Sequence, residues 1–174
     1  MLAAAGAPAA VLGFSSGAAL VLEAAAAGVP MAALALYDLP PEQPPEHVAA
    51  LAALIDAGRR GDAVEYFQRR LVGLPEDVVQ GLRRAPFRPA LEAVAHTLVT
   101  DAALVSAGRR PADLLARVGV RTLAIVAEGG FPGMREAAEA VARAVPDGQA
   151  TVLAGGTHDL DARLAPVLTA FFGR

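Results

Sequence analysis

The stretch Gly-Phe-Ser-Ser-Gly at residues 13–17 decides how this sequence is interpreted. An apolar run at residues 9–12 precedes it and an alanine-rich run at residues 18–27 follows it, a pattern that predicts a strand, a sharp turn and a helix. Ser15 stands at the apex of the turn. Such a turn strains the backbone of its central residue, and we expect glycines on both sides to relieve the clashes. The serine oxygen would then lie at the amino end of the helix, where the helix dipole favours negative charge.

This Gly-x-Ser-x-Gly spacing seldom arises by chance. With 17 glycines and three serines in 174 residues, about 0.03 matches are expected. The alternative is a glycine-rich strand-to-helix turn without a chemical role. The order of strand, turn and helix favours a nucleophile elbow, which presents Ser15 to a substrate.

Composition argues against several classes of function. The net charge of −3 is too small to indicate a nucleic-acid or membrane partner. The chain has no cysteine, and its two Gly-Gly pairs lack the spacing of a phosphate-binding loop, so we expect no metal and no cofactor. Residues 1–22 carry no charge, but Pro8 and the turn interrupt them and no basic region precedes them. We therefore expect a soluble, cytoplasmic protein without a secretory or membrane segment.

The rest of the chain predicts an α/β fold with a helical insertion. Strands are predicted at residues 31–37, 122–127 and 150–153, helices at residues 132–145 and 160–172, and a loop at residues 155–159. Alternating strands and helices with short links imply a parallel sheet with helices on both faces. In residues 42–118, prolines and glycines separate amphipathic stretches, which predicts four or five short helices.

The elbow, the helical insertion and the Gly-Thr-His-Asp segment at residues 156–159 together resemble the α/β-hydrolase family, in particular small bacterial serine hydrolases. The resemblance covers nearly the whole chain. It implies a partial α/β-hydrolase fold with about four parallel strands. Residues 1–41 would form the core with the elbow, residues 42–118 a helical lid, and residues 119–174 the rest of the core with the catalytic histidine.

The family places the elbow after the fifth of eight strands. The resemblance therefore implies that the first four strands are missing and that the natural protein begins upstream of Met1. In the family this fifth strand is interior. As an edge strand it would expose unpaired amides and carbonyls, which favours self-association through the sheet edge.

The resemblance also assigns the catalytic base. Ser15, as a nucleophile, needs a base that is oriented by an acid. In this fold the chain order is Ser, then Asp or Glu, then His, and His158 follows the last predicted strand, where the family places its base. His47 and His96 fall in the insertion. We expect His47 to be exposed and His96 to be a hydrogen-bonded lid or pocket residue.

Two carboxylates remain open as the acid. Many relatives carry an aspartate after the seventh strand, where this sequence has Phe131. Asp38 ends the strand before the insertion, a position that some members use, and Glu128 ends the following strand. We favour Asp38, because a carboxylate at the end of the strand beside the elbow can reach the histidine. The alternative for Asp38 is a turn cap before Pro40. We expect Asp159 to cap the last helix.

The resemblance implies an oxyanion hole with the Ser16 backbone amide as one donor. The family takes the second donor from a loop after its third strand, which the resemblance places before residue 1. Losing one donor costs about 10²–10³ in turnover, so we expect impaired activity.

The substrate is expected to be a small molecule bound in an apolar pocket beneath the lid. The pocket residues so implied are Phe14, Leu39, Phe67, Phe87 and Leu98. The leading hypothesis is an esterase-like serine hydrolase that forms an acyl-enzyme on Ser15. A non-catalytic hydrolase remnant or binding protein is the first alternative. A cofactor-free lyase is the second, because the fold alone does not choose among these activities.

Overall fold

The computed structural model describes residues 8–173, which divide into two compact units. The sheet unit comprises the described residues up to Pro41 and those from Arg110 onward, and the helical unit comprises Glu42–Arg109. The elements of the sheet unit are β1 (Ala10–Phe14), α1 (Ser16–Ala26), β2 (Ala33–Tyr37), α7 (Ala112–Leu115), β3 (Thr122–Gly129), α8 (Met134–Ala144), β4 (Gly148–Thr157) and α9 (Leu164–Phe172).

The four strands form one parallel sheet in the order β1-β2-β3-β4. Phe14 at the end of β1 pairs with Tyr37 at the end of β2, and Tyr37 pairs with Ile125 of β3. This confirms the predicted α/β class with a four-stranded parallel sheet. Because parallel strands all end at the same edge, the residues that follow β1, β2 and β4 are brought together there.

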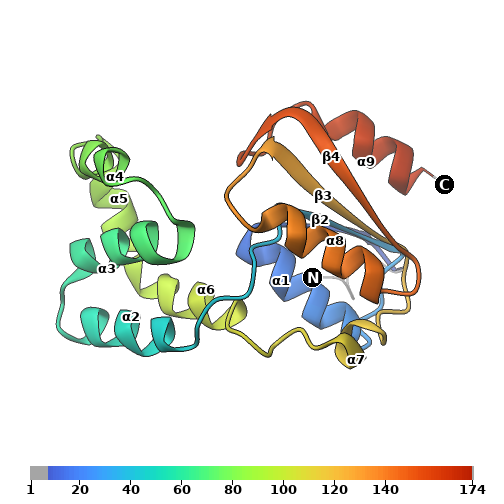
Figure 1. The fold of residues 1–174 in the computed structure, drawn as a ribbon, viewed down its shortest axis with the longest axis horizontal. Helices are drawn as coiled ribbons and strands as arrows, with labels where there is room; N and C mark the ends of the chain where they lie inside the picture. The colour runs from blue at the N-terminus through green and yellow to red at the C-terminus, as the bar shows by residue number, and fades with distance from the viewer. Residues whose placement is uncertain (1–7, 174) are drawn as a thin grey trace. The chain divides into compact units, whose positions relative to one another are not determined.

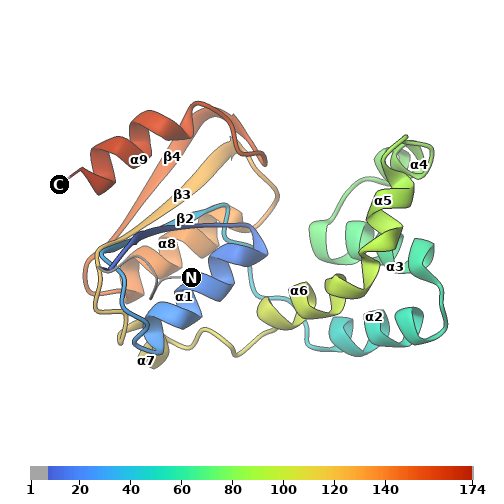
Figure 2. The same ribbon diagram turned by 180° about the vertical axis from the view of Figure 1, so that it is seen from behind.

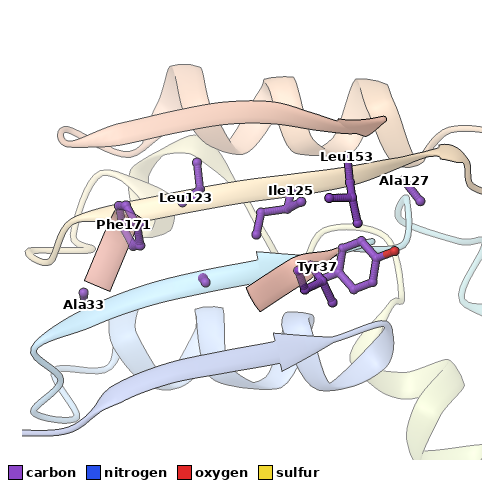
Figure 3. Packing of buried hydrophobic residues seen from close by; sticks show 9 residues of the cluster. Ala33, Tyr37, Leu123, Ile125, Ala127, Leu153 and Phe171 are labelled. Atoms are coloured by element: carbon purple, nitrogen blue, oxygen red, sulfur yellow. The ribbon is translucent and has the colours of Figure 1, made fainter. Parts of the chain in front are cut away.

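Helices cover both faces of the sheet (Figures 1 and 2). Helices α1 and α8 lie on one face, where Met134 and Ala138 of α8 pack against alternate residues of β3. Helix α9 lies on the other face, and Figure 3 shows its Phe171 together with Ile125 and Leu153 of the strands. Since β2 is covered on both faces, all five of its residues are buried, which explains its uninterrupted apolar sequence.

Strand β4 is longer than predicted. The sequence predicted a strand at residues 150–153 and a loop at residues 155–159, but β4 runs to Thr157. The pair Gly155-Gly156 predicts a loop, but both residues lie within β4, where they allow the strand to be irregular. Gly155 has a φ of +65°, and a Cβ on Gly156 would lie 3.0 Å from the Leu153 carbonyl oxygen. The β3–β4 register shifts at the same level, between Ala127 and Gly129.

The closing helix begins later than predicted. Helix α9 starts at Leu164 and its N-cap residue is Arg163, so the expectation that Asp159 caps it is wrong. The backbone amide of Asp159 instead bonds to the Thr157 carbonyl in a tight turn after β4.

The helical unit is more finely divided than the predicted four or five helices. Its elements are α2 (Glu46–Asp56), α3 (Arg60–Phe67), the π-helix η2 (Gln68–Val72), α4 (Glu76–Arg83), α5 (Arg88–Ala93), the 3-10 helix η3 (Ala95–Thr97) and α6 (Leu98–Leu104). Its core is built around Leu51, Ala63 and Ala102. The buried Glu65 carboxylate receives hydrogen bonds from Arg69, Arg83 and Arg88, which satisfies its charge.

The helical unit ends at Arg109, before the predicted limit of the insertion at residue 118. The segment that follows belongs to the sheet unit, because α7 packs against α8 and both Leu115 and Val118 are buried. Within residues 8–173, no helix is both long and apolar enough to cross a bilayer.

Gly13 and Gly17, on either side of Ser15, differ in how much space a side chain would have. A Cβ on Gly13 would lie 2.7 Å from both the Ala18 Cα and the Gly17 carbonyl oxygen, whereas a Cβ on Gly17 would meet no described atom within 4 Å. Only Gly13 is therefore sterically required, contrary to the expectation for both.

We expect Gly13→Ala to lower the free energy of unfolding by about 1–3 kcal/mol, because the backbone of α1 must shift. Gly17→Ala should leave it unchanged or raise it by up to about 1 kcal/mol, because alanine is the better helix former. Urea denaturation measures both variants, and equal losses would contradict the steric account.

Candidate active site

Ser15 occupies a strained turn between β1 and α1. Its φ is 53° and its ψ is −128°, a region that costs a non-glycine residue about 1–3 kcal/mol. Its backbone amide donates to the Tyr37 carbonyl at 3.0 Å, and its own carbonyl accepts from the Ala18 amide at 2.9 Å. The turn is therefore fixed by β2 on one side and by the first turn of α1 on the other. Ser16 is the first residue of α1.

Asp38 lies at the corresponding position after β2 and is fully buried. Its φ is 49°, and its backbone amide donates to the Ile125 carbonyl at 2.8 Å. One carboxylate oxygen accepts from the Ala127 amide at 2.7 Å, and the other lies 2.9 Å from His158 Nδ1. The carboxylate thus bonds to β3 and to the residue after β4 rather than to the turn before Pro40.

His158 follows β4 directly, and its side chain is 19% exposed. Because a carboxylate oxygen accepts hydrogen bonds, Nδ1–H is the donor to Asp38, and Nε2 is the ring nitrogen left to act as a general base. The ring also contacts Phe14 and Phe131, each with a centroid separation of 4.8 Å. Phe14 immediately precedes Ser15, so the histidine lies next to the elbow.

The Ser15 hydroxyl has no hydrogen-bond partner among residues 8–173. Hydrogen bonds between a nucleophile and its base are often long without substrate and shorten when it binds.

The second acid candidate has a different partner. Glu128 is exposed, and its Oε2 accepts from the Gly155 amide at 2.8 Å. This bond joins the ends of β3 and β4. Phe131, at the position where relatives were expected to carry an aspartate, presents a phenyl ring to His158 instead of a carboxylate.

Tyr37 is a part of this region that the sequence analysis missed. Its hydroxyl donates to the Thr157 carbonyl at 2.6 Å, and its ring stacks on Phe14 with a centroid separation of 5.4 Å. Burial, with the nearby Asp38 carboxylate as a smaller cause, raises the pKa of Tyr37 to about 12. A tyrosine ending an otherwise aliphatic buried strand was the available signal, since a buried hydroxyl needs a partner.

The other residues singled out in the sequence have varied surroundings. Leu39 is buried in the sheet unit. In the helical unit, Phe67 and Leu98 pack against its core, and Phe87 is half exposed. Their assignment to a substrate pocket stays a prediction.

Two expectations about histidines in the helical unit are wrong. His47 is half-buried rather than exposed, because its Nδ1 bonds to the Tyr66 hydroxyl at 2.8 Å. His96, the middle residue of the short helix η3, is exposed rather than packed in a pocket. Residues 8–173 contain no group of three or more His, Asp or Glu side chains arranged to hold a metal ion.

Similarity to a solved structure identifies the family. The chain is similar to an α/β hydrolase from Sphaerobacter thermophilus at 39% identity and a TM-score of 0.86, with 98% of this chain and 70% of that chain covered. The chain belongs to the α/β-hydrolase family.

This α/β hydrolase also shares its fold with more distant structures. A bromoperoxidase from Bacillus anthracis is 16% identical, with a TM-score of 0.66 over 99% of this chain and 70% of that chain. An acetylester hydrolase from Corynebacterium glutamicum is 15% identical, with a TM-score of 0.66 over 95% of this chain and 61% of that chain. No protein-family model and no curated protein sequence matches the chain.

The Tyr37 hydrogen bond predicts how stability depends on alkaline pH. The folded-state pKa of Tyr37, about 12, lies above its ordinary value of 10.0, so its contribution to stability is fully present below about pH 10. Between about pH 10 and 12 the unfolded chain ionises first, and the free energy of unfolding falls.

We expect Tyr37→Phe to be less stable than the wild type by about 1 kcal/mol at pH 8, because the Thr157 carbonyl loses its donor. The variant should also lose less stability on going from pH 9 to pH 11. Urea unfolding at several pH values tests this, and parallel pH profiles for the two proteins would refute it.

Proposed function

We propose that this α/β hydrolase is an esterase-like serine hydrolase that cleaves a small ester or acyl substrate through an acyl-enzyme on Ser15. The observation that carries the proposal is the 2.9 Å hydrogen bond between Asp38 and His158, formed beside the strained Ser15 turn. An acid–histidine pair next to a serine at a strand-to-helix turn is the arrangement that activates a hydroxyl.

Asp38 is proposed as the acid in preference to Glu128. The Asp38 carboxylate is fully buried, and one oxygen is already fixed by the Ala127 amide, so the other is oriented toward His158. Such a carboxylate keeps the imidazole in the required tautomer and stabilises the imidazolium that forms. Glu128 is exposed and bonded to a backbone amide of β4.

The proposed reaction has two halves, acylation of Ser15 and hydrolysis of the acyl-enzyme. In the first, Ser15 Oγ attacks the carbonyl carbon of the ester and its proton passes to His158 Nε2. The carbon–oxygen bond to the alcohol then breaks, and the alcohol leaves with that proton. In the second half, His158 takes a proton from water and the resulting hydroxide attacks the acyl carbon. The bond from that carbon to Ser15 Oγ then breaks, the proton on His158 returns to Oγ, and the carboxylic acid is released.

The negative oxygen formed in each half needs donors. We propose the Ser16 backbone amide as one, because Ser16 opens α1 and the amino end of a helix attracts negative charge. The apolar surface of Phe14 lies beside the same turn and is proposed to contact the acyl group.

A fluorophosphonate probe tests the nucleophile, because it bonds to an activated serine oxygen and expels fluoride. We expect the probe to label the chain and the label to map to Ser15, with Ser15→Ala and His158→Ala each abolishing it. The control is Ser106→Ala, since Ser106 is the remaining serine outside the motif and its hydroxyl bonds to the Ala102 carbonyl of α6. A folded wild-type protein that is not labelled would contradict the proposal and favour a binding protein.

The two carboxylates give a separate prediction. Asp38→Asn should slow probe labelling by about 10³-fold or more, because the amide no longer selects the base tautomer. Glu128→Gln should change the rate by less than about threefold, since only an exposed backbone contact is altered. Labelling rates at pH 7.5 measure both, and equal effects would overturn the assignment of Asp38.

A further inference from the structure

The His158 imidazole is fixed at one edge by a single hydrogen bond. Its Nδ1 bonds to Asp38, and within residues 8–173 no second hydrogen bond of the ring is found. A ring with one such bond can still pivot about the line joining Nδ1 to the carboxylate oxygen. Some other contact must therefore set the plane of the ring if Nε2 is to face the elbow.

Two phenyl rings provide that contact. Phe14 and Phe131 each lie 4.8 Å from the imidazole centroid, with interplanar angles of 36° and 53°. Both centroid separations fall within the range of about 4.5–7 Å in which aromatic pairs attract beyond simple burial. Phe14 comes from the end of β1 and Phe131 from the loop after β3, so the ring is contacted from two different strands.

Phe131 is itself well anchored. Its ring packs against the cluster formed by β3 and α8, which includes Val126 and Met134. The loop that carries it also passes close to the acid, because a Cβ on Gly130 would lie 3.5 Å from Asp38 Oδ1. The Gly130 amide donates to the Ala127 carbonyl at 3.0 Å and closes this loop. The backbone from Ala127 to Phe131 therefore contacts both members of the pair: the Ala127 amide bonds to Asp38, and the Phe131 ring contacts His158.

We propose that Phe131 is a positioning residue, which sets the plane of the His158 imidazole so that Nε2 faces Ser15. The proposal deepens the function proposed above and rests on it for the catalytic consequence. The Phe131 side chain has no group that can transfer a proton or form a hydrogen bond, so its proposed effect is exerted through the His158 ring that it contacts. The chemical requirement at residue 131 is an aromatic ring, whereas bulk alone is not sufficient.

The test compares Phe131→Tyr, which keeps the ring, with Phe131→Leu, which keeps apolar volume without a ring. The first readout is NMR of ¹⁵N-labelled protein, which reports the His158 tautomer and the low-field Nδ1 proton. We expect the wild type and Phe131→Tyr to show the Nδ1-protonated tautomer with a resolved Nδ1 proton. In Phe131→Leu that proton signal should broaden and the tautomers should mix.

The second readout is the rate of fluorophosphonate labelling. We expect Phe131→Leu to label about tenfold more slowly and Phe131→Tyr to stay within about threefold of the wild type. Phe172→Leu is the matched control, because its ring packs on Phe171 at 5.4 Å and does not contact His158. Circular dichroism and urea unfolding confirm that each variant is folded.

The outcomes separate the two proposals. An unlabelled wild-type protein would count against the serine hydrolase, while the NMR comparison would still decide the role of Phe131. Retention of the Nδ1 proton signal and tautomer in Phe131→Leu would overturn the positioning role. An equal loss of labelling in Phe172→Leu would also overturn it, because the effect would then reflect general destabilisation.

Discussion

The Asp38 carboxylate joins the carboxyl ends of three neighbouring strands. Asp38 follows β2, its Oδ1 accepts from the Ala127 amide in β3, and its Oδ2 bonds to His158 after β4. A buried carboxylate without partners would be strongly destabilising, so these two donors are a condition of the fold as well as of the site. The parallel strand order makes the arrangement possible, because it places the three strand ends at one edge of the sheet.

The same edge of the sheet contains the two strained residues of the described chain. Ser15 and Asp38 are its only non-glycine residues with positive φ, and each follows the last residue of its strand. Phe14 and Tyr37, which precede them, pair in register and stack on each other. The strain at each residue is offset by a backbone bond to the neighbouring strand, from Ser15 to Tyr37 and from Asp38 to Ile125. The rigid pairing of β1, β2 and β3 thus fixes the directions of both side chains.

Much of this arrangement follows from local sequence. The elbow was recognisable because its glycines, serines and flanking apolar runs are adjacent in the chain, and the strand that ends at Asp38 was recognisable from its apolar run. The parallel sheet followed from the alternation of strands and helices. The family resemblance then pointed to His158, a residue that periodicity alone would not have distinguished.

What the sequence did not predict depends on contacts between distant segments. The extension of β4 to Thr157 was missed because glycines usually mark loops, whereas here they allow an irregular pairing with β3. The Tyr37 hydroxyl bond and the Phe131 ring contact join residues far apart in the chain. The opposite steric demands of Gly13 and Gly17 depend on how closely α1 approaches the end of β1.

The most direct test of the central interaction is a double-mutant cycle on the free energy of unfolding, with Asp38→Asn, His158→Gln and the double variant. A hydrogen bond between a buried carboxylate and a histidine predicts a coupling of about 1–3 kcal/mol at pH 7. The parallel cycle with Glu128→Gln should be additive within about 0.5 kcal/mol, because Glu128 bonds to Gly155. Additivity in the Asp38 cycle, or a coupling found only with Glu128, would contradict this account of the site.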